Sequence, residues 1–331
     1  MRSPFFPLFT WLLLSVLLAF GSLFSLLSWS SFPLTIHHLV DTLMSFDSTS
    51  IEHQILLSIR IPRLLSGFTI GASLAISGAL IQGLTRNPLA SPSVLGINTG
   101  AACFMALAAI GAPFLVDLPS VVVAAMGGCV SGALVMILGG FFSSRPHKLK
   151  LILAGIAISA LFSGITRAAV ILADDKAYSV VSWLAGSLSS MSWVQWQILW
   201  PYSVSGLLLA IYIAKFLNLL SLGNEVATSL GLNITMTRTL TCLAVVLLTT
   251  SSVAVAGPIG FVGMLVPHIV KRLVGNDFHI LIPACGVLGG SLIVWADGFS
   301  RAIAFPAETP VGVITALIGT PFFIFLAMRG R

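Results

Sequence analysis

The chain has 331 residues, of which 57% are hydrophobic and only 8% are charged, with a formal net charge of +6. Roughly a quarter of the residues in an ordinary soluble domain are charged, so 16 basic and 10 acidic side chains are too few to cover a water-facing surface of this size. The composition therefore excludes a water-soluble globule and indicates an integral membrane protein.

The first apolar stretch runs from about Leu8 to Trp29. Small residues near Ala19 are typical of a signal-peptide cleavage point, but the hydrophobic run continues past them, so we favour an uncleaved first membrane span. The next segment, 30–58, is polar, and we predict that it is the longest non-spanning piece in the first half of the chain.

Apolar runs of about the length of a membrane span recur along the rest of the chain. A spanning helix needs about 20 apolar residues. Together with the first stretch, these runs predict an all-α integral membrane bundle of about ten helices, at 8–29, 61–83, 93–113, 119–140, 150–172, 197–217, 239–256, 260–273, 280–303 and 310–328. We treat residues 1–331 as a single transmembrane domain.

Small residues recur at four-residue spacing in the second predicted span, at Gly67, Gly71, Ala75, Ala79 and Gly83. This spacing lets helix backbones approach closely, which drives helix association in lipid. We therefore expect tight packing around this helix.

The basic residues predict the orientation, because cytoplasmic loops of membrane proteins are enriched in Lys and Arg. If both termini are cytoplasmic, eleven of the sixteen cations fall on the inner side, namely Arg2, Arg86, Arg145, Lys148, Lys150, Lys215, Arg238, Lys271, Arg272, Arg329 and Arg331. Seven of the ten acids then fall on the outer side, namely Asp41, Asp47, Glu52, Asp117, Asp174, Asp175 and Glu308. No Lys/Arg run is longer than two, so we expect no nucleic-acid partner.

The chain lacks the motifs of a nucleotide hydrolase or a metalloenzyme. None of its five lysines stands in a phosphate-binding Walker A loop, and its four cysteines lie singly, without metal-ligand spacing. We expect no catalytic residue, no metal site and no cofactor bound by this chain.

Five ionisable residues are not explained by orientation. Arg167 lies inside a predicted span, where charge is costly and is a candidate for function. Asp297 lies in another span, four residues before Arg301, so the two share a helix face; a structural ion pair and a role in transport both remain open. Arg60, Arg63 and Arg301 fall at outer span ends, where they either snorkel to lipid headgroups or meet an acidic partner or an anionic solute.

The predicted inner loop 218–238 contains a short helix. Asn224 is placed to cap a helix that starts at Glu225, and Gly231 is placed to end it. Apolar residues at four-residue spacing give this helix one apolar face, formed by Leu222, Val226 and Leu230. Such a helix is suited to the groove of another protein, and a plain connector is the alternative.

Short motifs are spread over nearly the whole chain: RIPR at 60–63, GASLAISG at 71–78, NPLASP at 87–92, LAG at 153–155, WLAG at 183–186, GPIGFVG at 257–263 and PVG at 310–312. Together they resemble the permease family of bacterial iron-siderophore, haem and cobalamin ABC importers. Within that family, LTRNPLASPSVLGINTGAA and KLILAGIAISA look most like a permease subunit of the ferric dicitrate importer.

The resemblance implies a type II importer permease bundle of ten spans in the bacterial inner membrane. It also implies several partners: a second permease, sibling or identical, two cytoplasmic ATPase subunits that bind ATP and Mg, and a periplasmic binding protein. The chain would be a transporter subunit rather than an enzyme, and it would move an iron(III) chelate, ferric dicitrate being preferred, from periplasm to cytoplasm. Another siderophore, haem or cobalamin is the alternative within the family, and a membrane-embedded lipid-modifying enzyme is the alternative from another class.

The resemblance also places functional residues. The family's outer arginines, which receive acidic residues of the binding protein, fall on Arg60, Arg63 and Arg301. The ATPase-coupling helix falls within 218–238, on Asn224, Glu225, Ala227, Leu230 and Gly231. The family's inner constriction includes Asn87 and Leu89. Arg167 agrees with the citrate importer on physical grounds, because an iron-citrate complex is anionic and a cation near the outer mouth of the translocation pathway would favour it.

Overall fold

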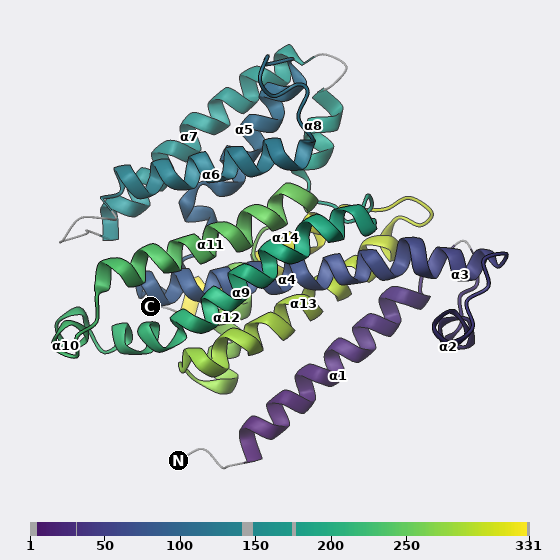
Figure 1. Ribbon diagram of the computed structural model, residues 1–331, viewed down its shortest axis with the longest axis horizontal. Helices are drawn as coiled ribbons and strands as arrows, with labels where there is room; N and C mark the ends of the chain where they lie inside the picture. The colour runs from purple at the N-terminus through teal and green to yellow at the C-terminus, as the bar shows by residue number, and fades with distance from the viewer. Residues whose placement is uncertain (1–4, 31, 141–147, 174–176, 330–331) are drawn as a thin grey trace.

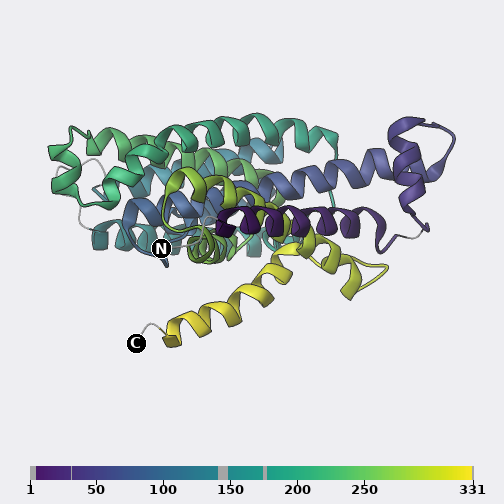
Figure 2. The same ribbon diagram turned by 90° about the horizontal axis from the view of Figure 1, so that it is seen from below.

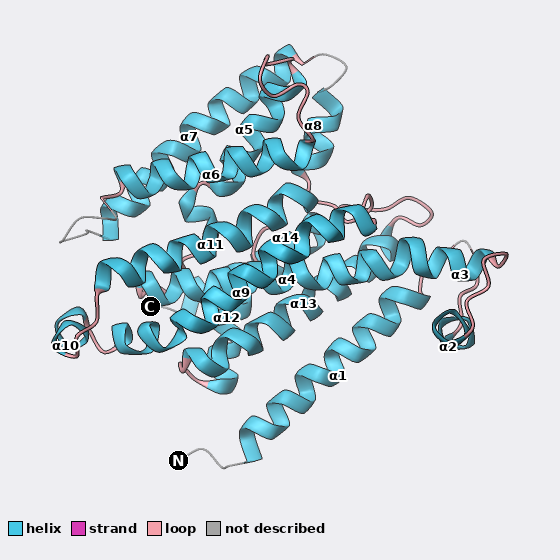
Figure 3. Ribbon diagram, in the orientation of Figure 1, coloured by secondary structure: helices cyan, strands magenta, loops and turns pink. Residues whose placement is uncertain are grey.

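The computed structural model describes residues 5–30, 32–140, 148–173 and 177–329. Within these ranges the chain consists of helices and loops, and no strand is found (Figure 3). Seven helical stretches are long and apolar enough to cross a membrane: 8–27, 51–85, 120–138, 150–172, 193–221, 234–256 and 278–303. The structure therefore confirms an all-α multi-pass membrane protein.

Each of the ten predicted apolar segments contains a helix. These helices are α1 (Phe5–Leu27), α4 (Ile61–Thr85), α5 (Ile97–Ala109), α6 (Ser120–Leu138), α7 (Lys148–Leu172), α9 (Trp193–Ser221), α11 (Ile234–Ala256), α12 (Val262–Val274), α13 (Phe278–Ile303) and α14 (Val311–Arg329). Helices α5, α12 and α14 are not among the seven stretches that meet the length and composition of a span. The total of ten membrane spans therefore stays a prediction.

The long helices run roughly along one axis, so the bundle has two ends (Figures 1 and 2). We call them the α10 end, which carries α10 (Asn224–Ser229), and the α2 end, which carries α2 (Ile36–Met44) and α3 (Ile51–Ile55). Helix α1 begins and α14 ends toward the α10 end. The first and last helices thus have their outer termini on the same side of the bundle.

Six of the described cations that were used to predict the orientation lie near the helix ends at the α10 end (Figure 1). They are Arg86, Lys150, Lys215, Arg238, Lys271 and Arg272. Of the other charges used to predict the orientation, Arg2, Arg145, Asp174, Asp175 and Arg331 lie outside the described residues. The side of the membrane that the α10 end faces stays a prediction.

Helix α4 lies at the centre of the bundle and packs against α9, α11, α12 and α13. A Cβ atom added at Gly71 would collide with the backbone carbonyl of Gly289 in α13, and one added at Gly78 would collide with that of Gly263 in α12. The prediction of close backbone packing along the small-residue stripe is therefore confirmed.

The sequence placed the start of the second span at residue 61, and the structure corrects it. Helix α3 begins at Ile51, where the side chain of Ser50 accepts a hydrogen bond from the backbone N–H of His53 at 3.4 Å. A π-helical turn, Leu56–Arg60, then joins α3 to α4. Because residues 30–58 are polar, the sequence analysis predicted neither this extension nor α2. Helix α8 (Ala177–Leu184) also lies outside the predicted segments.

Candidate functional site

The α2 end of the bundle holds a cluster of five charged side chains, which we call the arginine cluster: Arg60, Arg63, Asp297, Arg301 and Glu308. They come from the π-helical turn, from α4 and α13, and from the loop before α14. The sequence analysis grouped Arg60, Arg63 and Arg301 as outer arginines and placed Asp297 on one helix face with Arg301. The fold brings them together with Glu308, which sequence reasoning used only as an outer-side acid.

Asp297 is the centre of the arginine cluster and is 2% exposed. Its Oδ1 atom accepts a hydrogen bond from Nε of Arg63 at 2.8 Å and forms an ion pair with Nη2 of the same side chain, also at 2.8 Å. Its Oδ2 atom accepts from Nη2 of Arg301 at 3.1 Å and from the hydroxyl of Ser25 at 3.3 Å. A carboxylate is stable in such a buried place only when it is paired and hydrogen-bonded in this way.

Arg63 joins the buried centre of the cluster to its rim. Its remaining nitrogen, Nη1, donates to the carboxylate of Glu308 at 2.9 Å. The side chain of Glu308 is 34% exposed, whereas that of Arg63 is 6% exposed. Glu308 is therefore the one acidic member of the described cluster that solvent reaches.

Arg60 has a different environment, because its hydrogen bonds run to backbone carbonyls. Nη1 donates to Ser25 and Ser28, each at 3.3 Å, and Nη2 donates to Trp29 at 3.0 Å. Arg301 also donates to the carbonyl of Ser25, at 2.7 Å. These carbonyls lie at the C-terminal end of α1, where a helix leaves acceptors without an intrahelical donor.

The arginine cluster thus fastens α1 to α4 and α13, and it carries three guanidinium groups against two carboxylates. A cavity of about 250 Å³ lies beside it, lined by Trp29, Ser30, Phe32, Ile55, Ile59, Arg60, Arg63, Arg301, Phe305, Pro306, Ala307 and Glu308. The surplus positive charge and this cavity suit the site to an anionic group.

The structure decides between the alternatives that the sequence left open for these residues. The ion pair between Asp297 and Arg301 is confirmed at 3.1 Å. Snorkelling to lipid headgroups is wrong, because Arg60, Arg63 and Arg301 are at most 8% exposed and their guanidinium groups bond within the chain. Docking of a binding protein at these arginines stays a prediction.

At the opposite end, α10 forms as predicted but Asn224 does not cap it. The N-cap residue is Gly223, at φ +119°, with no capping side chain. The Oδ1 atom of Asn224 instead accepts a hydrogen bond from Nη2 of Arg86 at 2.7 Å, and the same nitrogen donates to the carbonyl of Leu220 at 2.6 Å. A charged donor gives the stronger hydrogen bond. The side-chain oxygen of Asn224 therefore accepts from the guanidinium of Arg86 and not from a backbone N–H of α10.

The end of α10 agrees with the prediction. Gly231 adopts φ +81°, and its N–H donates to the carbonyl of Thr228 at 2.9 Å. The N–H of Leu232 donates to the carbonyl of Ala227 at 3.0 Å. This pair of bonds is the Schellman arrangement, which favours glycine at the left-handed position.

One exposed face of the connection between α9 and α11 is apolar. Ala227 is fully buried, whereas Leu222 and Leu230 are each 60% exposed and Val226 is 47% exposed. Glu225 is also exposed. The apolar face that the sequence predicted is therefore free of cover within the described chain.

The predicted coupling loop is shorter than 218–238, because α9 runs to Ser221 and α11 starts at Ile234. Asn218 lies inside α9, where its amide donates to the carboxylate of Asp277 at 2.7 Å. This bond, with the bond from the backbone N–H of His279 at 3.0 Å, holds the pKa of Asp277 below its usual value. Asp277 in turn caps α13, so the start of α13 is tied to the end of α9.

Asn87 and Leu89 lie in a tight turn directly after α4. The Oδ1 atom of Asn87 accepts from the N–H of Leu89 at 3.0 Å, and its carbonyl accepts from the N–H of Ala90 at 3.1 Å. Leu89 is 44% exposed. Arg86, which precedes the turn in a left-handed conformation at φ +50°, connects it to α10 through Asn224. The sequence used Arg86 only for orientation and missed this link.

Arg167 lies on the exposed side of α7. Small exposed residues share this side at helical spacing, namely Ala157, Ala160, Gly164 and Ala168. Because α7 packs against α5 and α6, Arg167 belongs neither to the arginine cluster nor to the α10 end.

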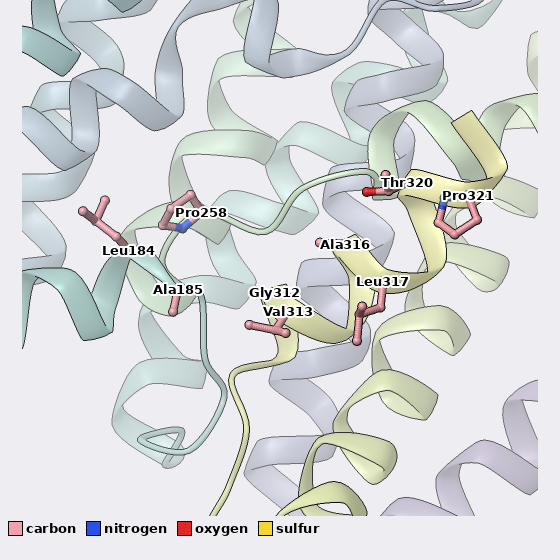
Figure 4. Close-up of a pocket in the computed structure, with 9 residues that line it drawn as sticks. All are labelled: Leu184, Ala185, Pro258, Gly312, Val313, Ala316, Leu317, Thr320 and Pro321. Carbon is pink, nitrogen blue, oxygen red and sulfur yellow. The ribbon is translucent and has the colours of Figure 1, made fainter. Parts of the chain in front are cut away.

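Three of the sequence motifs meet around a pocket of about 550 Å³ (Figure 4). The pocket is lined by Leu184, Ala185, Pro258, Gly312, Val313, Ala316, Leu317, Thr320 and Pro321. The N–H of Gly312 donates to the carbonyl of Gly186 at 3.0 Å, which fixes the start of α14 against the segment after α8. The lining has no charged side chain, so it suits an apolar surface better than an anion.

A family model described as the FecCD transport family matches residues 16–329. The Fe(3+)-citrate import system permease protein YfmD of Bacillus subtilis (strain 168) is 42% identical over 280 residues, covering 85% of this chain and 83% of the relative. The Fe(3+) dicitrate transport system permease protein FecC of Escherichia coli (strain K12) is 42% identical over 307 residues, covering 92% of each. A solved structure of an inward-facing metal-chelate type ABC transporter matches with a TM-score of 0.84 at 28% identity, covering 96% of this chain and 98% of that one.

Proposed function

We propose that this chain, which belongs to the FecCD transport family, carries ferric dicitrate across a bacterial inner membrane into the cytoplasm. As a family member it is a permease subunit of an iron(III) chelate ABC importer; the citrate chelate is the proposal. The observation that carries it is the 42% identity to permeases named for iron citrate and iron dicitrate. Another siderophore, haem or cobalamin is the alternative cargo.

Arg167 supports an anionic cargo. Iron(III) bound by two citrate ions carries net negative charge, and an exposed guanidinium on a spanning helix offers a charged contact where lipid offers none. We assign Arg167 to electrostatic preference within the translocation pathway.

The α10 end supports coupling to partner ATPases. Its exposed apolar face is a surface suited to a groove on another protein, and Arg86 ties α10 to the turn that contains Asn87 and Leu89. We propose that two ATPase subunits, which would bind ATP and Mg, move α10, and that the movement reaches the Asn87–Leu89 turn through Arg86. This chain would then contribute no ATP hydrolysis of its own.

The arginine cluster supports docking of a periplasmic binding protein at the α2 end. The cluster has a surplus of one positive charge beside a cavity, which suits an acidic side chain of a partner. In this arrangement Arg60 is the first cation to receive the partner, because Arg63 and Arg301 are already paired with Asp297.

A second permease, sibling or identical, is the remaining partner. The uncharged pocket beside α14 (Figure 4) supports an apolar partner surface there. Helix α14 also exposes large apolar side chains, among them Val313, Leu317 and Ile324.

The membrane-embedded lipid-modifying enzyme is disfavoured by the state of Asp297. A carboxylate that acts as a general base must be free to accept a proton from its substrate. Both oxygens of Asp297 already accept hydrogen bonds from guanidinium groups, so this buried acid suits a structural role.

Uptake of radiolabelled iron tests the cargo, in cells that carry the complete system with this chain as the permease. Iron is supplied as citrate, hydroxamate and catecholate chelates, and haem and cobalamin are supplied in parallel. We expect uptake of the citrate chelate to exceed the others and to stop when the partner ATPase is inactivated. Preferential uptake of any other cargo would overturn the citrate assignment and leave the family role intact.

A further inference from the structure

Helix α2 runs across the bundle rather than along it. Figure 1 shows α2 end-on while the long helices lie horizontally, and Figure 2 shows it upright beside the same horizontal helices. Its axis is therefore roughly perpendicular to the spanning helices, which places it parallel to the membrane plane. It follows α1 in the chain and lies just beyond the end of that helix.

One side of α2 rests on the protein. Thr42 is 5% exposed and donates its hydroxyl to the carbonyl of His38 at 2.6 Å, and α2 contacts α3 and the π-helical turn. The residues that flank the helix cap both of its ends. The side chain of Thr35 accepts from the N–H of His38 at 3.3 Å, and the N–H of Ser45 donates to the carbonyl of Asp41 at 2.8 Å.

The exposed side of α2 is divided into two stripes of different chemistry. Ile36, Val40 and Met44 are 60%, 46% and 85% exposed and lie at four-residue spacing on one stripe. The neighbouring stripe carries His37 and Asp41, whose side chains pair at 2.6 Å. A helix that lies in a membrane interface shows this division, because one stripe enters the acyl boundary while the other meets water and headgroups.

Exposed aromatic side chains occur on both sides of α2 in the chain. Trp29 and Phe32 precede the helix at 46% and 42% exposed, and Phe46 follows it at 47%. Aromatic residues gather at the level where the acyl chains meet the headgroups. Helix α1, which ends at Leu27, also exposes Phe20 and Leu23, so the apolar surface of a peripheral span leads directly to α2.

We propose that α2 is an interfacial helix, with the Ile36–Val40–Met44 stripe immersed at the boundary of headgroups and acyl chains of the leaflet at the α2 end. The stripe carries no charge and therefore suits lipid. A soluble acidic partner would be drawn to the arginine cluster instead of to this stripe. The helix would fix the height of α3 and the π-helical turn relative to the membrane, and with them the position of Arg60. The inference rests on the membrane location of the chain and not on its cargo.

Fluorescence quenching by spin-labelled lipid tests the proposal in the full-length protein. The protein is placed in nanodiscs of phosphatidylethanolamine and phosphatidylglycerol, with or without phosphatidylcholine that carries a doxyl group near the headgroup. Cys129 is first replaced by Ser, since it is the exposed cysteine of the described chain. An environment-sensitive dye is then attached to Val40→Cys or Ile36→Cys, with His37→Cys as the matched control on the polar stripe.

We expect the lipid quencher to reduce emission from positions 36 and 40 by about twofold relative to position 37. A water-soluble quencher should give the reverse order. Equal quenching at all three positions would overturn the proposal. So would emission at positions 36 and 40 that lipid quencher leaves unchanged, including the case in which a protein partner shields them.

Discussion

Asp297 is the residue on which the α2 end depends, because two buried guanidinium groups share its carboxylate. Without this carboxylate, Arg301 has no acidic partner and Arg63 is paired only with Glu308; breaking a buried ion pair costs about 3–5 kcal/mol. Arg63→Gln is less severe than Asp297→Asn in this respect, since it leaves Asp297 bonded to Arg301.

Asp297→Asn is therefore expected to lower the thermal unfolding temperature of the purified protein in detergent substantially. Glu308→Gln is the matched control, because Glu308 pairs with Arg63 at a partly exposed rim, where an ion pair contributes about 1 kcal/mol or less. Equal effects of the two variants would contradict the central position assigned to Asp297.

Arg60 differs from the other two arginines, because its described hydrogen bonds run to carbonyls of Ser25, Ser28 and Trp29. If it receives an acidic side chain of the binding protein, Arg60→Gln removes a charge-assisted bond of about 1.5–3 kcal/mol. Affinity of the binding protein for the reconstituted importer should then fall by about tenfold or more. Lys215→Gln, at the α10 end, is the control, and an unchanged affinity in Arg60→Gln would reject the docking role.

At the scale of elements, a side-chain hydrogen bond links α10 to the end of α4, while α10 packs against α9 and α11. Asn224→Ala and Arg86→Ala each remove the 2.7 Å bond between these residues. Each variant should insert into the membrane normally. Each should transport less iron chelate per ATP hydrolysed than the unchanged protein. Because Arg86→Ala removes this bond together with the one to the carbonyl of Leu220, the double variant should lose little more than Arg86→Ala alone; additive losses would show that the bond does not carry the coupling.

The packing of α4 on α12 depends on the absence of a side chain at Gly78. Gly78→Ala would drive a Cβ atom into the backbone carbonyl of Gly263, and overpacking of this kind costs about 1–3 kcal/mol or more. Gly164→Ala on α7 is the control, because a Cβ atom there meets open space. Thermal unfolding in detergent should show a clear loss for the first variant and none for the second.

At the scale of the whole molecule, the distribution of cations predicts that the α10 end faces the cytoplasm. In a Cys129→Ser background, Ser229→Cys at the α10 end should react with an impermeant maleimide only after the cells are opened. Thr49→Cys, at the α2 end, should react in intact cells. The opposite labelling pattern would reverse the orientation.

Much of the fold follows from properties of consecutive residues. The ten apolar segments each contain a helix, because length and hydrophobicity are local properties that the bilayer selects. The small-residue stripe correctly predicted close packing, and Gly231 correctly predicted the end of α10. The helix start at Ile51 was missed, because polar residues that cap and solvate a helix end look like a loop in the sequence.

What the sequence determined by itself was a helical membrane protein, its motifs and the placement of Asp297 and Arg301 on one helix face, four residues apart. What only the tertiary structure decided was which distant groups share a site: Arg63 with Asp297 across 234 residues, Arg86 with Asn224 across 138, and the transverse position of α2. The physical reason is that helix formation and spacing along one face depend on neighbouring residues. The partners of a buried charge depend instead on which helices pack together, which the local pattern does not encode.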